Sequence, residues 1–380
     1  MLQPYDGPME RFDAIVIGAG PAGSTAAFRL SRAGARVLLL DRERFPRDKP
    51  CGGGLTYRAV RELPFTVKPV VEDTVRHVRL GFRYERSIER HTEGPLILMT
   101  QRRRLDAHLA DQAAAAGADF RDGVRATALE ADERSVTVRF GGSAATAPVA
   151  IGADGVNGLT VRALGLQGDR AHGVALEGNV DHSHAREDYR GRAVVELGAV
   201  PGGYAWVFPK GDHVNVGVGG WESEGPRLRE HLERACSEYG VPAERLESVR
   251  GFRLPMRRPG DRARSGRVLL AGDAAGLVDP LSGDGMYEAF VSARLAVECV
   301  LADRLDDYEP ALDRELGRSF AASWKAKYAL ERAPRLIFGV ARLPLVWGFV
   351  SGFLRGDFKH PGEARGLVRA PLRLVETLGR

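Results

Sequence analysis

The stretch VIGAGPAGSTAA, residues 16–27, places three glycines where an apolar run gives way to an Ala-rich segment. The apolar run at residues 13–18 predicts a short buried strand, and the composition of residues 20–33 predicts a helix. A second apolar run, ARVLLLDR at residues 35–42, predicts another strand. Strand, helix and strand in this order form a βαβ unit, which indicates an α/β fold with a parallel sheet.

The glycines Gly18, Gly20 and Gly23 have the spacing G-x-G-x-x-G of dinucleotide-binding loops. In such a loop Gly18 permits the tight turn, Gly20 lets the backbone approach a pyrophosphate, and Gly23 lets the helix pack close to the strand. The helix start offers free N–H groups and the positive end of a dipole to the anion. Asp41 and Arg42 end the next strand, where Asp41 can accept hydrogen bonds from a ribose.

A second Gly-rich turn lies far along the chain. GRVLLAGDAAG, residues 266–276, predicts a buried strand that runs into Gly272 and Asp273, and Gly283 and Gly285 then open a long helix. A carboxylate here can bind a ribityl hydroxyl, and a helix start can face the O2 edge of a flavin, where negative charge collects on reduction. An ordinary loop between strand and helix explains the same residues, because glycine loops are frequent.

Composition limits the remaining classes. The 380 residues are 44% hydrophobic and 28% charged, which is enough for a large core and two lobes. Cys51, Cys236 and Cys299 form no C-x-x-C pair, so no disulfide framework or metal site is predicted. Residues 1–13 lack the apolar core of a signal peptide, and we expect a reducing, cytoplasmic compartment. The basic stretches lack interleaved aromatic residues, so no nucleic-acid partner is expected.

Elsewhere the pattern changes along the chain. A helix is predicted over residues 101–118, and strands over 134–140 and 146–151. Short β runs broken by Gly, Pro and Asp over residues 171–220 indicate an antiparallel sheet. From about residue 284 onward nearly all of the sequence reads as helical.

PGGYAWVFPKGDHVNVGVGG, residues 201–220, carries Tyr204, Trp206 and Phe208 at alternate positions. Alternation places the three rings on one face of a strand. Such a face usually packs on a hydrophobic core, but an apolar ligand pocket is lined in the same way, and the sequence leaves both open. Lys210 is either a solvated lysine after the strand or a partner for a diphosphate.

Three segments together resemble the signatures of FAD-dependent oxidoreductases related to the aromatic hydroxylases: GAGPAG, GADG at residues 152–155, and AGDAAGLVDP at residues 271–280. The resemblance implies that Arg102, in R-x-x-L-D, lies near the FAD phosphates and that Asp273 binds the ribityl chain.

The same resemblance places Asp154 and Gly155 in the segment that closes over the pyrophosphate. A Ser is usual where this sequence has Gly158, so a side-chain hydrogen bond is expected to be lost at that position.

RDKPCGGGL, residues 47–55, and the pattern Y-x-W-x-F-P, formed by Tyr204, Trp206, Phe208 and Pro209, resemble the geranylgeranyl reductase family. Members of this family reduce isolated C=C bonds in polyprenyl chains. The resemblance implies a substrate pocket lined by these four residues and a polyprenyl lipid or prenyl diphosphate as substrate. NADPH or a ferredoxin-like protein is the implied electron donor.

An isolated C=C bond has no carbonyl to accept hydride density, so its reduction needs a proton as well as hydride from N5 of reduced FAD. We expect protonation at the less substituted carbon, which builds positive charge on the other. The faces of Tyr204 and Trp206 can stabilise that charge in a pocket without water. Cys51 is the candidate proton donor or flavin-side gate, because glycines permit close approach to its thiol. A small residue in a glycine loop is the plain alternative.

We therefore expect an α/β protein with a Rossmann-like FAD-binding domain, an inserted antiparallel-sheet substrate domain and a helical C-terminal region. The expected ranges are 11–75, 95–158 and 262–305 for the first, 76–94 and 159–261 for the second, and 306–380 for the third. Two other functions stay open, namely a flavin monooxygenase or hydroxylase of the same superfamily and a non-catalytic membrane-associated flavoprotein or electron carrier. The sequence does not indicate an oligomeric state.

Residues 336–354, LIFGVARLPLVWGFVSGFL, are strongly hydrophobic but contain Arg342 and Pro344. A membrane-spanning helix needs a cleaner apolar run. A core helix fits, and so does a helix on the membrane surface, aided by the basic tail at residues 365–380. The second alternative would place the protein at the inner face of the membrane.

Overall fold

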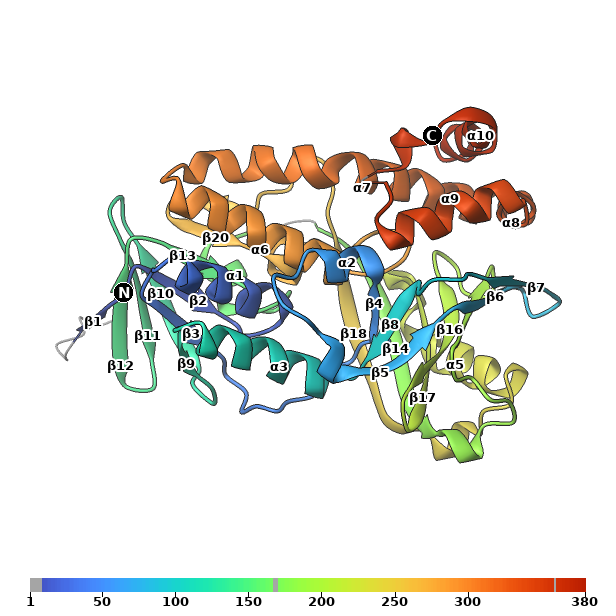
Figure 1. The fold of residues 1–380 in the computed structure, drawn as a ribbon, viewed down its shortest axis with the longest axis horizontal. Helices are drawn as coiled ribbons and strands as arrows, with labels where there is room; N and C mark the ends of the chain where they lie inside the picture. The colour runs from blue at the N-terminus through green and yellow to red at the C-terminus, as the bar shows by residue number, and fades with distance from the viewer. Residues whose placement is uncertain (1–8, 167–169, 359) are drawn as a thin grey trace.

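A computed structural model describes residues 9–166, 170–358 and 360–380. Two sheet-based lobes lie at opposite ends of the molecule, and long C-terminal helices run along one side of both (Figure 1). The α/β class, the antiparallel sheet in the middle of the sequence and the helical C-terminal region are confirmed. The expected domain boundaries stay a prediction.

The first lobe is built on a six-stranded sheet in which every neighbouring pair is parallel except β19 with β20. In spatial order its strands are β19 (Arg264–Ser265), β20 (Val268–Leu270), β13 (Ala150–Gly152), β2 (Ala14–Ile17), β3 (Val37–Leu40) and β9 (Asp119–Arg121). The central strands are fully buried, which explains why the sequence shows them as continuous apolar runs.

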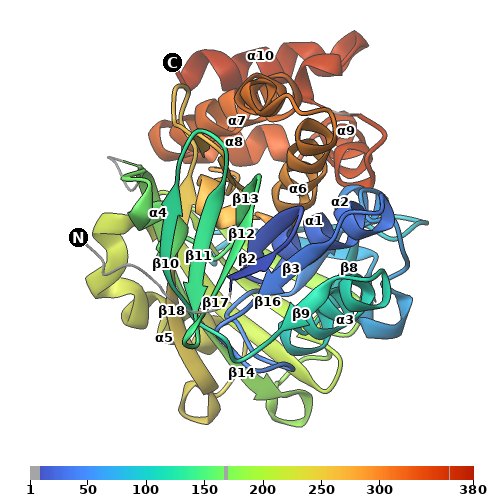
Figure 2. The same cartoon turned by 90° about the vertical axis from the view of Figure 1, so that its left-hand side faces the viewer.

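Alternate residues of these strands enter two different cores. Ala14 and Val16 pack with helices on one face, whereas Ile15 and Ile17 pack against a four-stranded sheet on the other. The covering helices are α1 (Pro21–Arg32), α3 (Arg102–Ala115) and α6 (Met286–Leu301). The covering strands, in spatial order, are β1 (Met9–Arg11), β12 (Ser143–Ala147), β11 (Val136–Phe140) and β10 (Ala126–Ala131). Figure 2 shows these two layers on either side of β2 and β3.

The second lobe is a seven-stranded sheet in which all pairs are antiparallel except β15 with β6. In spatial order its strands are β18 (Glu247–Met256), β14 (Ala171–Asp181), β17 (His213–Trp221), β16 (Tyr204–Lys210), β15 (Arg192–Leu197), β6 (His77–Phe82) and β7 (Arg86–His91). Helix α5 (Leu228–Glu238) covers one face, where Val207, Val216 and Leu232 share a core. The opposite face looks toward the first lobe.

A three-stranded sheet lies between the lobes, in the order β4 (Gly54–Thr56), β8 (Ile97–Thr100) and β5 (Val71–Val75). The short helix α2 (Tyr57–Arg61) follows β4 directly. Residues 51–53 directly precede β4 and therefore lie between the two lobes, next to β16 of the seven-stranded sheet.

The prediction of one strand over residues 146–151 is wrong. The segment contributes to two strands in different sheets, the end of β12 and the start of β13. Pro148 lies between them, and it cannot donate a ladder hydrogen bond. The sequence therefore shows one apolar run where the chain changes layers.

The hydrophobic segment 336–354 forms two helices rather than one. They are α8 (Pro334–Ala341) and α9 (Pro344–Arg355), and they are bent by 81°. Leu343 is extended, with ψ 127°, because proline disfavours a helical conformation in the residue before it. In the described parts of the chain no single helix is long and apolar enough to cross a membrane, and this bent pair passes that test only when its halves are taken together.

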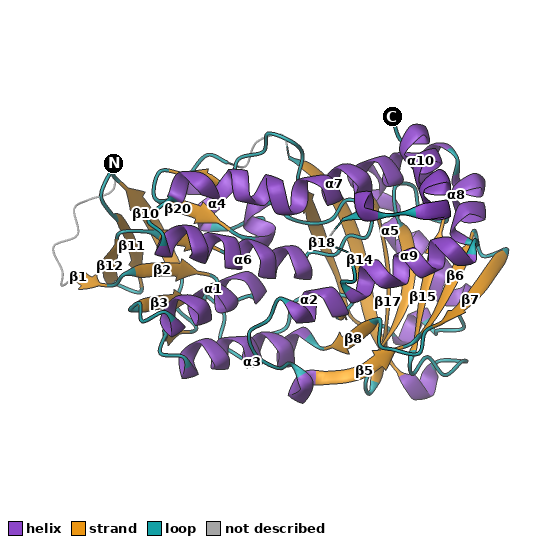
Figure 3. Cartoon of the chain, turned by 45° about the horizontal axis from the view of Figure 1, so that its top comes forward, coloured by secondary structure: helices purple, strands orange, loops and turns teal. Residues whose placement is uncertain are grey.

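The short helix α4 (Leu159–Ala163) follows β13 of the first lobe. Helices α7 (Tyr308–Arg332) and α10 (Arg369–Leu378) complete the C-terminal region. Figure 3 shows α6 and α7 side by side, with α7 extending from the first lobe toward the second. This helix places residues of the C-terminal region against the turn that precedes β16.

Candidate functional site

The glycine loop between β2 and α1 has the geometry that the sequence predicts. Gly18 has φ +99°, and a Cβ on it would lie 2.4 Å from the Ala153 carbonyl oxygen. A Cβ on Gly23 would lie 1.8 Å from the Gly18 carbonyl oxygen, so both positions require glycine. Gly20 begins α1, and a Cβ there would approach only Arg47, at 3.5 Å. No side-chain cap hydrogen bond is made at the start of α1, because its N-cap residue is Gly20.

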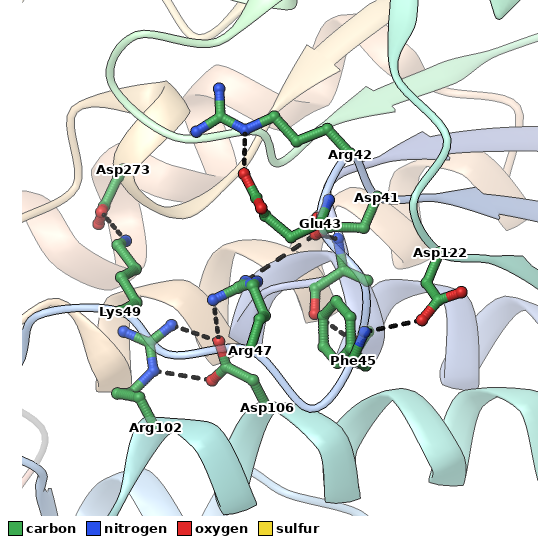
Figure 4. A network of polar contacts seen from close by, with 12 residues as sticks. Asp41, Arg42, Glu43, Phe45, Arg47, Lys49, Arg102, Asp106, Asp122 and Asp273 are labelled. Carbon is green, nitrogen blue, oxygen red and sulfur yellow. Dashed lines mark hydrogen bonds and ion pairs between the residues drawn. The ribbon is translucent and has the colours of Figure 1, made fainter. Parts of the chain in front are cut away.

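Asp41 supports this loop from the end of β3. Its carboxylate accepts hydrogen bonds from the backbone N–H of Ala19 at 2.8 Å and of Glu43 at 2.9 Å. The neighbouring Arg42 is half exposed and pairs with Glu43 at 3.2 Å (Figure 4). The structure therefore places Asp41 at the glycine loop and directs Arg42 toward solvent.

Arg102 and Arg47 share one buried carboxylate. Arg102 makes two hydrogen bonds of 2.7 Å to Asp106, and Arg47 approaches the same carboxylate at 2.8 Å (Figure 4). Burial opposes the charge of Arg102, but Asp106 holds its pKa above the usual value. Arg47 also lies 3.9 Å from Asp41, so this network links α3 to the glycine loop.

The second Gly-rich turn meets the same region. Lys49 donates to the Asp273 carboxylate at 2.8 Å (Figure 4). Burial alone would raise the pKa of Asp273, but Lys49 and Arg102 hold it below the usual value. Gly272 has φ +57°, and a Cβ on it would lie 3.2 Å from the Ala22 Cβ, so glycine brings this turn close to α1.

Gly283 and Gly285 lie in the loop that opens α6. Gly283 has φ +67°, and Gly285 directly precedes the helix. A Cβ on Gly285 would lie 3.4 Å from the Asp273 Oδ1 atom. Because Gly272 also lies close to Ala22 of α1, the two Gly-rich segments meet although they are far apart in sequence.

Asp154 faces the start of α4. Its carboxylate accepts a hydrogen bond from the Thr160 backbone N–H at 3.0 Å and another from the Thr160 hydroxyl. A Cβ on Gly158 would lie 2.1 Å from the Asp154 Oδ1 atom, so the usual Ser does not fit beside this carboxylate. Burial raises the pKa of Asp154, against the hydrogen bonds from Thr160. Gly155 forms the turn with φ +81°. Contacts of Asp154 and Gly155 with a pyrophosphate stay a prediction.

The aromatic side chains of β16 do not face the core under α5. Their neighbours Ala205 and Val207 belong to that core, so alternation turns Tyr204, Trp206 and Phe208 to the other face. The three rings follow one another along the strand, with centroids 5.8 and 6.2 Å apart. Below, they are called the aromatic ladder.

The alternation of side chains along β16 also decides on which face of the sheet Pro209 and Lys210 lie. Pro209 lies on the face of Val207, away from the aromatic ladder, and its predicted contact with a substrate is not supported by this placement. The expectation of a solvated Lys210 is wrong, and a contact of Lys210 with a diphosphate stays a prediction. Lys210 is only 5% exposed, and its ammonium donates to the Cys51 carbonyl at 2.5 Å.

The loop Cys51–Gly52–Gly53 lies directly on the aromatic ladder. A Cβ on Gly52 would lie 2.9 Å from a ring carbon of Phe208 and 3.6 Å from the Trp206 Nε1 atom. Gly53 has φ +82°, and a Cβ on it would lie 2.2 Å from the Thr100 carbonyl oxygen. The two segments that resemble the geranylgeranyl reductase family are thus in contact.

Polar groups tie the aromatic ladder to its surroundings. The Trp206 Nε1–H donates to Asn215 at 2.8 Å, and the Tyr204 hydroxyl donates to the Ser282 carbonyl. Burial raises the pKa of Tyr204. Because Ser282 directly precedes Gly283, this contact joins the substrate-side strand to the second Gly-rich turn.

The residues between the Gly-rich turns fit an FAD-type ligand. Gly20 leaves room above an uncapped helix start, and Arg47, Lys49 and Arg102 supply cations next to it. Sequence reasoning missed Arg47 and Lys49, although both stand in RDKPCGGGL. It also missed Glu177, whose carboxylate accepts from the Cys51 N–H at 2.6 Å, because no local pattern marks a polar residue in a strand.

Comparison with known proteins gives consistent results. The family model described as "FAD binding domain" matches residues 11–296. The chain is 33% identical over 340 residues to the menaquinone reductase of Mycobacterium tuberculosis, with 82% of each chain covered. It is 32% identical to digeranylgeranylglycerophospholipid reductase 1 of Methanopyrus kandleri, with 76% of this chain and 80% of the relative covered.

Among solved structures, the chain is similar to a geranylgeranyl bacteriochlorophyll reductase-like protein of Thermoplasma acidophilum. The TM-score is 0.81, and 97% of this chain and 100% of the other are covered. At 23% identity this likeness shows that the two proteins share a fold.

Proposed function

This chain belongs to the geranylgeranyl reductase family of FAD-binding flavoproteins, and we propose that it saturates isolated C=C bonds in the polyprenyl chain of a lipid. The observation that carries the proposal is the contact between the Cys51 loop and the aromatic ladder, beside the two Gly-rich turns. Reduced FAD supplies hydride from N5 in such a reaction.

The chain's own residues have separate tasks. Gly18, Gly20 and the start of α1 receive the pyrophosphate, and Asp273 with Lys49 holds the ribityl side. The faces of Tyr204 and Trp206 stabilise the positive charge that builds as a proton adds to the double bond. Their apolar surroundings exclude water, which would otherwise capture that charge.

Cys51 is the proposed proton donor. Its thiol accepts a weak contact from the Gly53 N–H at 3.4 Å, and it is half exposed whereas Cys236 and Cys299 are buried. Proton transfer from Sγ to one carbon and hydride addition to the other together add two hydrogens per double bond. A Cys51→Ser variant that keeps full prenyl reduction would remove this role.

Lys210 follows the aromatic ladder on the same face of β16, and its ammonium donates one hydrogen bond to the Cys51 carbonyl. The ammonium has two further donors that can meet a phosphate. The two relatives compared above are named for a menaquinone and for a glycerophospholipid, and a third, from Rhodobacter capsulatus, is named for geranylgeranyl diphosphate. We therefore propose a polyprenyl chain that ends in a lipid head, a quinone or a diphosphate, and the substrates of the experiment below distinguish the three.

A lipid substrate also gives a reason for contact with a membrane. Leu336, Leu343, Leu345 and Val350, on and between α8 and α9, are at least 37% exposed, next to the basic tail. We propose peripheral binding of this surface at the inner face of the membrane, with NADPH or a ferredoxin-like protein as electron donor. Co-flotation with anionic vesicles at low salt, lost in Leu345→Glu, is the expected result; no flotation at any salt would contradict it.

The decisive experiment is anaerobic. The bound flavin is reduced with dithionite, candidate polyprenyl quinones, lipids and diphosphates are added, and flavin reoxidation is followed together with product mass. A gain of two hydrogens per double bond supports the proposal. Oxygen-dependent formation of a hydroxylated product would instead indicate the monooxygenase, and unchanged lipid with a reoxidisable flavin would indicate an electron carrier.

A further inference from the structure

Both backbone polar groups of Cys51, which belong to the two peptide groups on either side of its Cα, are held by buried side chains. The Cys51 N–H donates to the Glu177 Oε1 atom at 2.6 Å, and the Cys51 carbonyl accepts from the Lys210 ammonium at 2.5 Å. The two side chains come from neighbouring parts of one sheet, since β14 and β16 both pair with β17. A carboxylate and an ammonium thus fix the backbone on both sides of the Cys51 Cα.

These two side chains are buried at a cost. Glu177 and Lys210 are each 5% exposed, and the Glu177 Oε2 atom has no hydrogen-bond partner among the described residues. Burial raises the pKa of Glu177, while Lys210, the Cys51 N–H and the Asn215 side chain act in the opposite direction. Buried charges with incomplete partners do not favour folding compared with apolar residues of the same size. We therefore look for the role of Glu177 and Lys210 in the backbone of Cys51, which both side chains hold in place.

The geometry points to Glu177 and Lys210 as positioning residues that fix the Cys51 loop against the aromatic ladder. Glu177 lies in register with Gly217, which in turn lies across from Trp206, so all three are on the same face. Because the backbone N–H and carbonyl of Cys51 are both held, the next residue, Gly52, is kept so close to Phe208 that a Cβ on it would lie 2.9 Å from the ring. The positioning of the loop does not depend on the proposed function, whereas its expected effect on kcat rests on that function.

Thiol labelling tests the inference without any substrate. Cys51 is the half-exposed cysteine and the other two are buried, so iodoacetamide alkylation of the FAD-loaded protein reports on this loop, with Cys51→Ser as the blank. The limiting rates at high pH are compared, so that differences in thiol ionisation drop out. We expect Glu177→Met and Lys210→Met each to speed alkylation about tenfold, as the loss of one hydrogen bond to a charged group allows.

Two further variants separate positioning from general destabilisation. Glu177→Gln keeps an acceptor for the Cys51 N–H and is expected to fall between the wild type and Glu177→Met. The double variant Glu177→Met with Lys210→Met is expected to be alkylated at the same rate as either single variant, because the loss of one hydrogen bond already frees the Cys51 loop. Glu196→Gln is the matched control: Glu196 is a buried glutamate in the same sheet that accepts from the Tyr84 N–H at 2.7 Å, on the other face. It should leave the alkylation rate unchanged.

The results discriminate clearly. Wild-type alkylation rates in Glu177→Gln and Lys210→Met, or an equal rise in Glu196→Gln, would overturn the inference, and these substitutions suffice if Glu177→Met does not fold. If the labelling pattern holds but no lipid is reduced by any variant, the proposed function fails and the positioning role stands. If lipids are reduced by the wild type, kcat should fall in both Met variants while the affinity for FAD stays the same.

Discussion

Trp206 lies across from Gly217, and its ring occupies the space that any side chain at residue 217 would need. A Cβ built on Gly217 would lie 2.1 Å from the Trp206 Cζ2 atom. Gly219 lies across from Tyr204, and a Cβ on it would lie 3.7 Å from the Trp206 Cζ3 atom, so both glycines of NVGVG lie next to the Trp206 ring. Two motifs that look independent in the sequence are therefore one structural unit.

Gly217→Ala should displace the Trp206 ring. Overpacking of this kind costs about 1–3 kcal/mol, and we expect the free energy of unfolding to fall by that amount, with a shift of the tryptophan emission. Gly251→Ala is the control, since its Cβ would be 3.4 Å from the nearest atom, an ordinary contact. Equal stability of both variants would contradict the prediction.

Trp206→Phe removes the indole N–H and leaves the Asn215 oxygen without its donor at 2.8 Å. An unsatisfied buried amide costs about 1–3 kcal/mol. Turnover of polyprenyl substrate should fall, while FAD remains bound and the fold persists, as measured by flavin absorbance and circular dichroism. Loss of FAD from this variant would mean that the ring serves mainly the cofactor side.

Asp106→Asn should be severe, because it leaves the buried Arg102 and the half-buried Arg47 without their shared carboxylate. Breaking a buried ion pair costs about 3–5 kcal/mol. Urea unfolding and FAD titration should both show the loss. The matched surface change is Asp119→Asn, which removes one partner of the more exposed Arg121 and should cost about 1 kcal/mol or less.

Gly158→Ser restores the residue that is usual in related flavoproteins, yet it should destabilise this chain. The new Cβ would collide with the Asp154 carboxylate and displace it from Thr160. The double variant Gly158→Ser with Thr160→Ala should be more stable than the sum of the two single effects, because Ser can then take over as donor. Additive losses in thermal unfolding would show that the two positions do not exchange roles.

Lys327 should make stability depend on pH above neutrality. Its ammonium donates to the Gly202 carbonyl and lies 4.3 Å from the centre of the Trp221 ring, and burial lowers its pKa to about 8, against Asp279 and Glu331. Between pH 8 and about 10.5 the unfolded chain then binds more protons than the folded one, so stability rises with pH in this window.

The contribution of this lysine is at most about 3 kcal/mol, from a pKa difference of two to three units. Lys327→Met should abolish it. The check is the difference in free energy of unfolding between wild type and variant at pH 7.5 and pH 10. A difference that does not change between these two pH values would contradict the assignment.

The sequence was sufficient to predict a feature when the residues that form the pattern also make the structure that the pattern predicts. Gly18 and Gly23 need glycine because of their own turn and helix, and the buried strands of the first lobe appear as apolar runs. The alternation of Tyr204, Trp206 and Phe208 correctly placed the three rings on one face, since side chains along a strand alternate whatever lies around it.

Tertiary structure decided everything that depends on which segments meet. Lys210 looked like a surface lysine, but its partner is a carbonyl 159 residues away in sequence, on the Cys51 loop. Glu177 had no signal at all, because its role exists only once β14 pairs with β17 and faces that loop. The sequence by itself determined the dinucleotide turn and the ladder of rings, both set by local backbone geometry. Only the folded chain, by bringing distant backbone groups to buried charges, decided that the ladder faces Cys51 rather than the core.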